Sequence, residues 1–207
     1  MTLLVALDYA AVLIFALTGA LSASRAQLDL IGFAFLAALT GIGGGTLRDV
    51  LLDRNPIFWI EQPTYLAVTS LAALLVFFTA HLVESRYRLL LWLDAVALGV
   101  AVAAGIGVAL AMQQPAIIAV LMGIVTGCMG GLMRDVVCNE VPLVLRQGEL
   151  YVSAALAGAA SGVVAASLGL QSLGVLGVAI AVTVFLRAGS LAFGWRLPIY
   201  KHEPPKS

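Results

Sequence analysis

Charged residues are scarce in this chain: only 11% of its 207 residues are Asp, Glu, Lys or Arg. Basic and acidic residues balance to a formal net charge of zero, so no basic surface predicts nucleic-acid binding. The only cysteines, Cys128 and Cys138, form no metal-ligand pattern with the only histidines, His81 and His202. Both cysteines are interpreted as small apolar packing residues.

Catalytic signals are also missing. The sequence shows neither a nucleophile-base pair nor a metal-ligand cluster, and the segment GIGGGT at 41–46 lacks the Lys-Ser/Thr that follows the glycines of a phosphate-binding loop. We therefore predict a protein that is not an enzyme and that needs no cofactor and no transition metal.

Apolar residues dominate instead, at 62% of the chain with a mean hydropathy of +1.07. Soluble domains contain about 45–50% apolar residues, so this composition predicts a membrane protein with several spans. A helix needs about 20 apolar residues to cross the hydrocarbon layer. Seven segments of this kind predict an all-α fold, at about 3–23, 30–52, 64–83, 89–112, 115–138, 149–169 and 172–194.

The chain repeats itself at a spacing of 86 residues. Residues 40–56 (TGIGGGTLRDVLLDRNP) align without a gap with residues 126–142 (TGCMGGLMRDVVCNEVP). Each copy covers three predicted spans, and an odd number of crossings reverses the direction of the second copy, which predicts inverted repeats. The predicted units are a first repeat at 1–86, an inverted second repeat at 87–170, a seventh transmembrane helix at 171–195 and a cytoplasmic tail at 196–207.

Basic residues in the predicted loops orient the chain. With the N-terminus outside, the outer loops hold little positive charge beyond Arg54. The cytoplasmic side then receives Arg25, Arg86, Arg88, Arg146, Arg196, Lys201 and Lys206. Positive charge concentrates on the cytoplasmic side of membrane proteins, so we predict an inner-membrane protein with an outer N-terminus and a cytoplasmic C-terminus.

Glycine clusters stand inside the second and fifth predicted spans, at Gly43, Gly44 and Gly45 and at Gly130 and Gly131. Each glycine costs a helix about 1 kcal/mol relative to alanine, so we expect a kink or an interruption there. Freed carbonyls would suit a monovalent cation near Gly41, Gly43, Gly127 and Met129. The alternative is close helix packing, but packing does not call for three glycines in succession.

An Arg-Asp pair follows each glycine cluster, as Arg48-Asp49 and Arg134-Asp135. An arginine at membrane depth needs a partner. Two compatible interpretations remain open. In the first, each arginine binds carbonyls freed in the other repeat, while each aspartate caps the N-terminus of a half-helix and neutralises the arginine. In the second, these groups narrow a hydrated path in which the aspartates attract cations and the arginines form a barrier or gate.

Three further ionisable residues lie in apolar segments. Asp8 and Asp94 are related by the repeat and stand near the starts of the first and fourth spans. Each is either a cation-attracting residue at a pore mouth or the partner of an arginine on an adjacent helix. Arg187, near the end of the seventh span, is expected to extend its side chain to the membrane interface.

The repeat, the glycine clusters and the Arg-Asp pairs resemble those of prokaryotic trimeric intracellular cation (TRIC) channels over spans one to six. The resemblance implies a homotrimer in a lipid membrane, with a pore in each protomer that passes K+, or also Na+, between kinked second and fifth helices. Met129 departs from a second glycine triplet. Relatives of this kind are also labelled as glycine transporters, so a secondary transporter for glycine or another small amino acid is the alternative.

Overall fold

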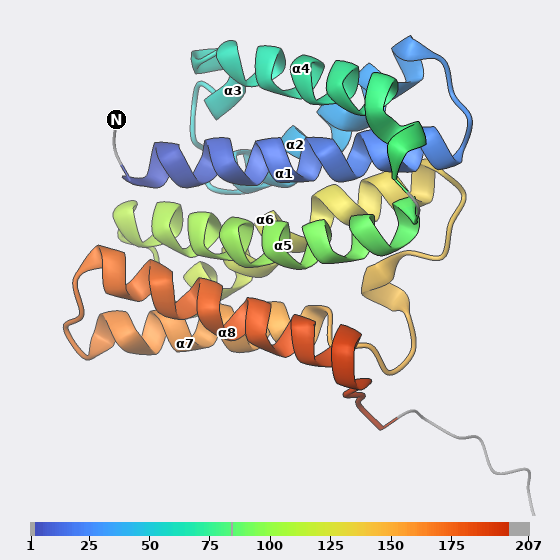
Figure 1. Ribbon diagram of the computed structural model, residues 1–207. Coiled ribbons are helices and arrows are strands. Elements are labelled where there is room, and N and C mark those ends of the chain that lie inside the picture. Colours follow the sequence, from blue (N-terminus) through green and yellow to red (C-terminus); the bar gives the residue numbers. More distant parts are fainter. Residues whose placement is uncertain (1–2, 84, 199–207) are drawn as a thin grey trace, which may run out of the picture.

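The computed structural model describes residues 3–83 and 85–198, and this part of the chain folds into eight α-helices and two short 3-10 helices (Figure 1). Lys201, Lys206, His202 and the rest of the tail beyond residue 198 lie outside the described residues. The elements are α1 (Leu3–Arg25), α2 (Leu30–Leu51), α3 (Phe58–Glu61), α4 (Thr64–Thr79), η1 (Ala80–Leu82), α5 (Arg86–Ala111), α6 (Ala116–Val137), η2 (Leu143–Leu145), α7 (Val152–Ser167) and α8 (Ser172–Phe193).

The long helices follow the apolar segments of the sequence. Six helical segments of the described chain are long and apolar enough to cross a membrane, including α4 continued by η1. The sixth predicted span holds α7, which has only 16 residues and a length of about 24 Å at 1.5 Å per residue. The polar connection after α2 contains the four-residue helix α3, which the sequence did not indicate. The fold is therefore an all-helical membrane fold.

Helices α1 and α5 lie side by side at the centre of the fold (Figure 1). On one side α4 packs against α1 and α2, and on the other side α7 and α8 pack against α5. Helix α5 is buried on all faces along the run 97–106, which explains its continuous apolar sequence. Helices α2 and α6 contact each other directly and join the two halves.

The sequence repeat is visible in the helix bounds. Helix α2 spans Leu30–Leu51 and α6 spans Ala116–Val137, so both ends recur at the spacing of 86 residues. Each helix is followed by a tight connection and a short helix, α3 in the first half and η2 in the second. Equivalent residues of the two halves therefore occupy equivalent positions along their helices.

Candidate functional site

Both glycine clusters lie within continuous helices. Helix α2 passes through Gly43–Gly45 and α6 passes through Gly130–Gly131 without a break in the α-helix. The predicted interruption is therefore wrong, whereas a bend of the intact helices stays a prediction. The carbonyls of an intact helix keep their helical partners, so a cation near the four named carbonyls also stays a prediction, one that requires the helix to open.

Glycine allows α2 and α6 to cross in direct backbone contact. A Cβ built on Gly44 would collide with the carbonyl oxygen of Thr126, and one built on Gly130 would collide with the carbonyl oxygen of Thr40. These two contacts are related by the repeat, since Thr40 corresponds to Thr126 and Gly44 to Gly130. The crossing is antiparallel, so Arg48 lies beyond one end of it and Arg134 beyond the other.

Three successive glycines are needed because three different groups approach α2. Gly44 meets α6, as described above. A Cβ on Gly43 would lie 2.8 Å from the Sδ atom of Met133, and a Cβ on Gly45 would lie 2.7 Å from the ring of Phe58. Consecutive helix residues point in directions about 100° apart, so each glycine admits a neighbour on its own side. Close packing therefore does explain three successive glycines, contrary to the expectation from the sequence.

The first ion-pair cluster consists of Arg48, Asp8 and Asp49. Arg48 donates from Nε to Asp49 Oδ1 at 2.7 Å and from Nη1 to Asp8 Oδ1 at 2.8 Å. The second oxygen of Asp49 accepts the main-chain N–H of Phe58 at 3.0 Å, which fixes the start of α3. Arg48 and Asp49 are fully buried, whereas the Asp8 side chain keeps 10% of its surface exposed.

The second ion-pair cluster, Arg134, Asp94 and Asp135, repeats this geometry. Arg134 donates from Nε to Asp135 at 2.8 Å and from Nη1 to Asp94 at 2.9 Å, and Asp135 accepts the N–H of Leu143 at 2.9 Å. Arg134 also donates to the hydroxyl of Thr18 at 2.9 Å, a contact between the two halves of the chain. Its side chain is completely buried.

These contacts bear on the open interpretations. Asp8 and Asp94 are arginine partners, and Asp49 and Asp135 neutralise the arginines as expected. A cation-attracting role for these carboxylates stays a prediction. The arginines bind carboxylates of their own repeat, not carbonyls of the other one, so that part of the tethering interpretation is wrong. Asp49 and Asp135 do cap main-chain N–H groups, but those groups belong to the following short helices. Two carboxylates face one buried guanidinium in each cluster, and the partly exposed Arg54 adds a second positive charge 3.7 Å from Asp49 in the first one.

Space for water leads toward the first cluster. A pocket of about 240 Å³ is lined by Asp8 and Arg54 together with the apolar ends of α1 and α5. Beyond Asp8, a cavity of about 10 Å³ lies against Thr40, Gly44 and Thr126. This volume is about the minimum that holds one water molecule, so α2 and α6 pack closely at the crossing in this conformation.

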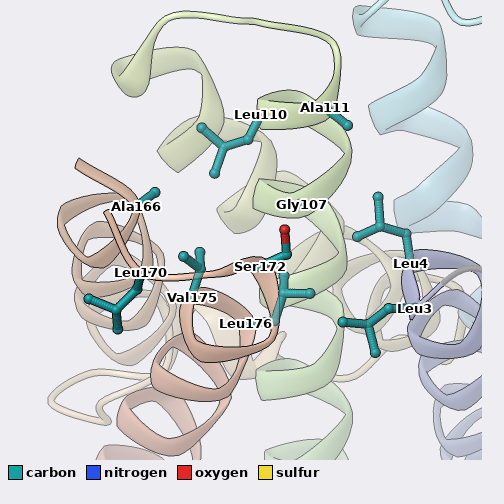
Figure 2. Close-up of a pocket in the computed structure, with 10 residues that line it drawn as sticks. All are labelled: Leu3, Leu4, Gly107, Leu110, Ala111, Ala166, Leu170, Ser172, Val175 and Leu176. Atoms are coloured by element: carbon teal, nitrogen blue, oxygen red, sulfur yellow. The ribbon is translucent and has the colours of Figure 1, made fainter. Parts of the chain in front are cut away.

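A larger apolar pocket lies away from the ion pairs. Figure 2 shows its ten lining residues, which come from the N-terminal ends of α1 and α8 and the C-terminal ends of α5 and α7. It has a volume of about 420 Å³, and Ser172 supplies the only polar side chain among these ten residues. The pocket contains none of the residues predicted for the site, and its walls offer no charge to an ion.

Sequence reasoning missed several polar groups near the clusters. Thr40 and Thr126 donate back to the carbonyls of Leu36 and Met122, so their side chains stay satisfied within the helices beside the cavity. A threonine within a predicted helix can be expected to donate to the carbonyl four residues earlier. The sequence does not show, however, that these two threonines lie at the crossing. Arg187 does not extend to the interface: its side chain is fully buried and binds Glu149.

The chain matches a known family twice. The family described as Glycine transporter matches residues 5–81 and again residues 91–167, so the two matches begin at the spacing of the repeat. A UPF0126 membrane protein of Vibrio cholerae is 39% identical over 203 residues, which cover 96% of this chain and 83% of that protein. The UPF0126 inner membrane protein YadS of Escherichia coli is 35% identical over 201 residues, 94% of each chain.

A solved structure decides the family. The TRIC trimeric intracellular cation channel orthologue from Rhodobacter sphaeroides is 43% identical, superposes with a TM-score of 0.91, and the match covers 94% of this chain and all of that one. The chain belongs to the prokaryotic TRIC channel family. In this TRIC protein the family match includes both ion-pair clusters and both glycine clusters.

Proposed function

We propose that this TRIC protein is a monovalent cation channel, with K+ as the main permeant ion and Na+ as a second, and with one pathway in each protomer along the crossing of α2 and α6. One observation carries the proposal. Two buried Arg-Asp clusters lie at opposite ends of a glycine-lined helix crossing, and each holds two aspartates against one buried arginine. The carboxylates at both ends favour cations over anions in such a passage.

The proposed pathway begins at the pocket beside Asp8 and Arg54 and continues into the small cavity beside Thr40 and Thr126. It then passes the glycine contacts and ends at the second cluster. Arg48 and Arg134 act as barriers, while the four aspartates attract cations. Opening requires α2 and α6 to separate or bend at Gly43, Gly44, Gly45, Gly130 and Gly131, and this movement would expose main-chain carbonyls to the ion.

The assembly and topology form part of the same proposal. The Rhodobacter sphaeroides relative is a trimeric channel, which supports a homotrimer here. The E. coli relative is an inner membrane protein, and the basic loops support an outer N-terminus. We assign residues 1–86 and 87–170 to two inverted repeats, 171–195 to a seventh spanning helix and 196–207 to a cytoplasmic tail, with lipid around the trimer.

The second candidate is a secondary transporter for glycine or another small amino acid. The description of the matching family favours it, and inverted repeats with a central site are compatible with alternating access. The cavity at the crossing measures only about 10 Å³, so either candidate requires α2 and α6 to separate.

Ion flux into liposomes separates the two candidates. Purified protein is reconstituted, and K+ flux under an imposed voltage is measured in the same vesicles as uptake of labelled glycine. We expect a voltage-driven K+ flux that does not saturate and does not need glycine. Saturable glycine uptake coupled to an ion gradient, without an independent K+ flux, would replace the channel by the transporter.

A further inference from the structure

Arg187 on α8 is a buried arginine that has no counterpart in the repeat. Its side chain has no exposed surface, and its Nη1 atom donates to Glu149 Oε2 at 2.8 Å. Its Nε and Nη2 atoms are buried and find no hydrogen-bond partner among the described residues. Burial of an incompletely paired guanidinium is costly, which makes a purely structural role for Arg187 a poor explanation.

Arg187 reaches the second ion-pair cluster through Tyr151. Its Cζ atom lies over the Tyr151 ring, 5.0 Å from the ring centre. The Tyr151 hydroxyl points to Gly131: a Cβ built there would lie 3.1 Å from that hydroxyl, 3.5 Å from Asp94 Oδ1 and 3.6 Å from Arg134 Nη2. Tyr151 therefore stands between the guanidinium of α8 and the ion pair of α5 and α6.

The first repeat holds its equivalent tyrosine differently. Tyr65 corresponds to Tyr151, and its ring is stacked on Tyr9 with 3.9 Å between the centres. Ala95 occupies the position that corresponds to Tyr9, so the repeat supplies no stacking ring for Tyr151. The cation of Arg187 covers that ring instead, and the attraction between a cation and an aromatic face strengthens in desolvated sites.

The segment before Tyr151 contacts both α8 and the residues that follow α8. Glu149 pairs with Arg196 in an antiparallel bridge, and Leu197 donates its N–H to the carbonyl of Gly148 at 2.9 Å. The Ser190 hydroxyl accepts the N–H of Leu150 at 3.2 Å. Movement of α8 would therefore move Tyr151 relative to the second cluster.

We infer that Arg187 is a positioning residue that holds the second ion-pair cluster shut through Tyr151, which makes α8 a control element for one end of the pathway. This role rests on the proposed channel function. At the first cluster the described residues place Arg54, from the connection after α2, 3.7 Å from Asp49 instead of an arginine of α8. The two ends of the pathway are therefore controlled differently although their central ion pairs are equivalent.

Single-channel recording of Arg187→Gln tests the inference. We expect a rise of about fivefold or more in open probability, as expected for loss of about 1 kcal/mol, at an unchanged unit conductance. Arg187→Lys keeps the charge facing Glu149, so its open probability is expected to lie between those of Arg187→Gln and the original protein. Arg88→Gln, which removes an exposed arginine from the first turn of α5, is the matched control and should leave gating unchanged.

The rate at which Cys128 is chemically modified gives a second readout. A purely structural role of Arg187 would not change this rate from one face alone. Cys128 is 1% exposed and belongs to the same buried cluster as Tyr151. In a Cys138→Ser background it is the only thiol, and a small cationic methanethiosulfonate is applied to each face in turn. Arg187→Gln should accelerate modification about fivefold from one face only. Acceleration from both faces would indicate general loosening and would overturn the inference.

Glu149→Gln keeps the test decisive if Arg187→Gln does not fold, because this side chain is 28% exposed and glutamine still offers an oxygen that accepts a hydrogen bond from Arg187. Glu149→Gln should also raise the open probability, as Arg187→Gln does. Unchanged gating and unchanged Cys128 modification in a folded variant would overturn the role of Arg187 while the channel stands. Absence of any cation conductance in the unsubstituted protein would instead overturn the proposed function, and the inference with it.

Discussion

Arg48 and Arg134 form equivalent ion pairs at the two ends of the α2–α6 crossing. Each binds the aspartate that follows it in sequence and a second aspartate 40 residues earlier, at distances of 2.7–2.9 Å. The same local sequence has therefore produced the same buried cluster twice, on two antiparallel helices. A buried ion pair contributes little net stability but is costly to break, so each cluster resists rearrangement.

Removal of one partner from the second cluster should destabilise the protein. Arg134→Gln leaves Asp94 and Asp135 buried without their cation, and we expect a loss of about 3–5 kcal/mol. The double variant Arg134→Gln/Asp94→Asn should recover part of that loss. Thermal unfolding in detergent measures both.

The control for this cycle is Arg25→Gln. Its pair with Glu140 is about 30% exposed on both sides, so its loss should cost no more than about 1 kcal/mol. If the losses in unfolding free energy caused by Arg134→Gln and Asp94→Asn simply add in the double variant, the two residues are not coupled, which would contradict the ion pair.

Asp8 should raise the local cation concentration at its end of the pathway. It faces a pocket of about 240 Å³, and its carboxylate is the one that stays partly exposed in the first cluster. We expect Asp8→Asn to reduce unit K+ conductance several-fold at low salt and by less in about 1 M KCl, where the Debye length falls to about 3 Å. Asp53→Asn, an exposed carboxylate near the end of α2, should have little effect. A reduction that persists at high salt would exclude this electrostatic role.

Alanine at the helix crossing should separate α2 from α6. The methyl group of Gly44→Ala or Gly130→Ala meets a main-chain carbonyl that cannot rotate away, so we expect a loss of about 1–3 kcal/mol in unfolding free energy together with altered flux. Gly177→Ala on α8 is the control, because a Cβ there meets nothing within 4 Å. That change should stabilise the helix by up to about 1 kcal/mol. Equal melting temperatures for all three variants would argue against the close crossing.

The sequence predicted the long helices and the repeat well because both depend on local information. Hydropathy places the membrane-crossing helices, and the recurrence of Arg-Asp after glycine identifies the residues of both clusters. The partners of Asp8 and Asp94 were left open, since nothing in a linear sequence distinguishes an arginine partner from a pore-mouth carboxylate. The repeat did show that the two aspartates would share one role.

The roles of Gly44 and Arg187 could not be predicted in the same way. The need for glycine comes from Thr126, a residue 82 positions away on another helix, and local helix propensity does not contain that contact. Arg187 lies outside the repeat and pairs with Glu149 in the connection between η2 and α7. A charged residue within an apolar span is itself a signal of function, and that signal was available at Arg187.

The most direct test of the central claim probes the helix crossing with a cysteine. Thr126→Cys is introduced into a Cys128→Ser/Cys138→Ser background, and K+ flux through the reconstituted protein is followed while a cationic methanethiosulfonate is added. A pathway along α2 and α6 predicts that modification of Cys at this position blocks K+ flux, with no block in the background protein. Complete modification with undiminished K+ flux would contradict the account, because ions would then be crossing elsewhere.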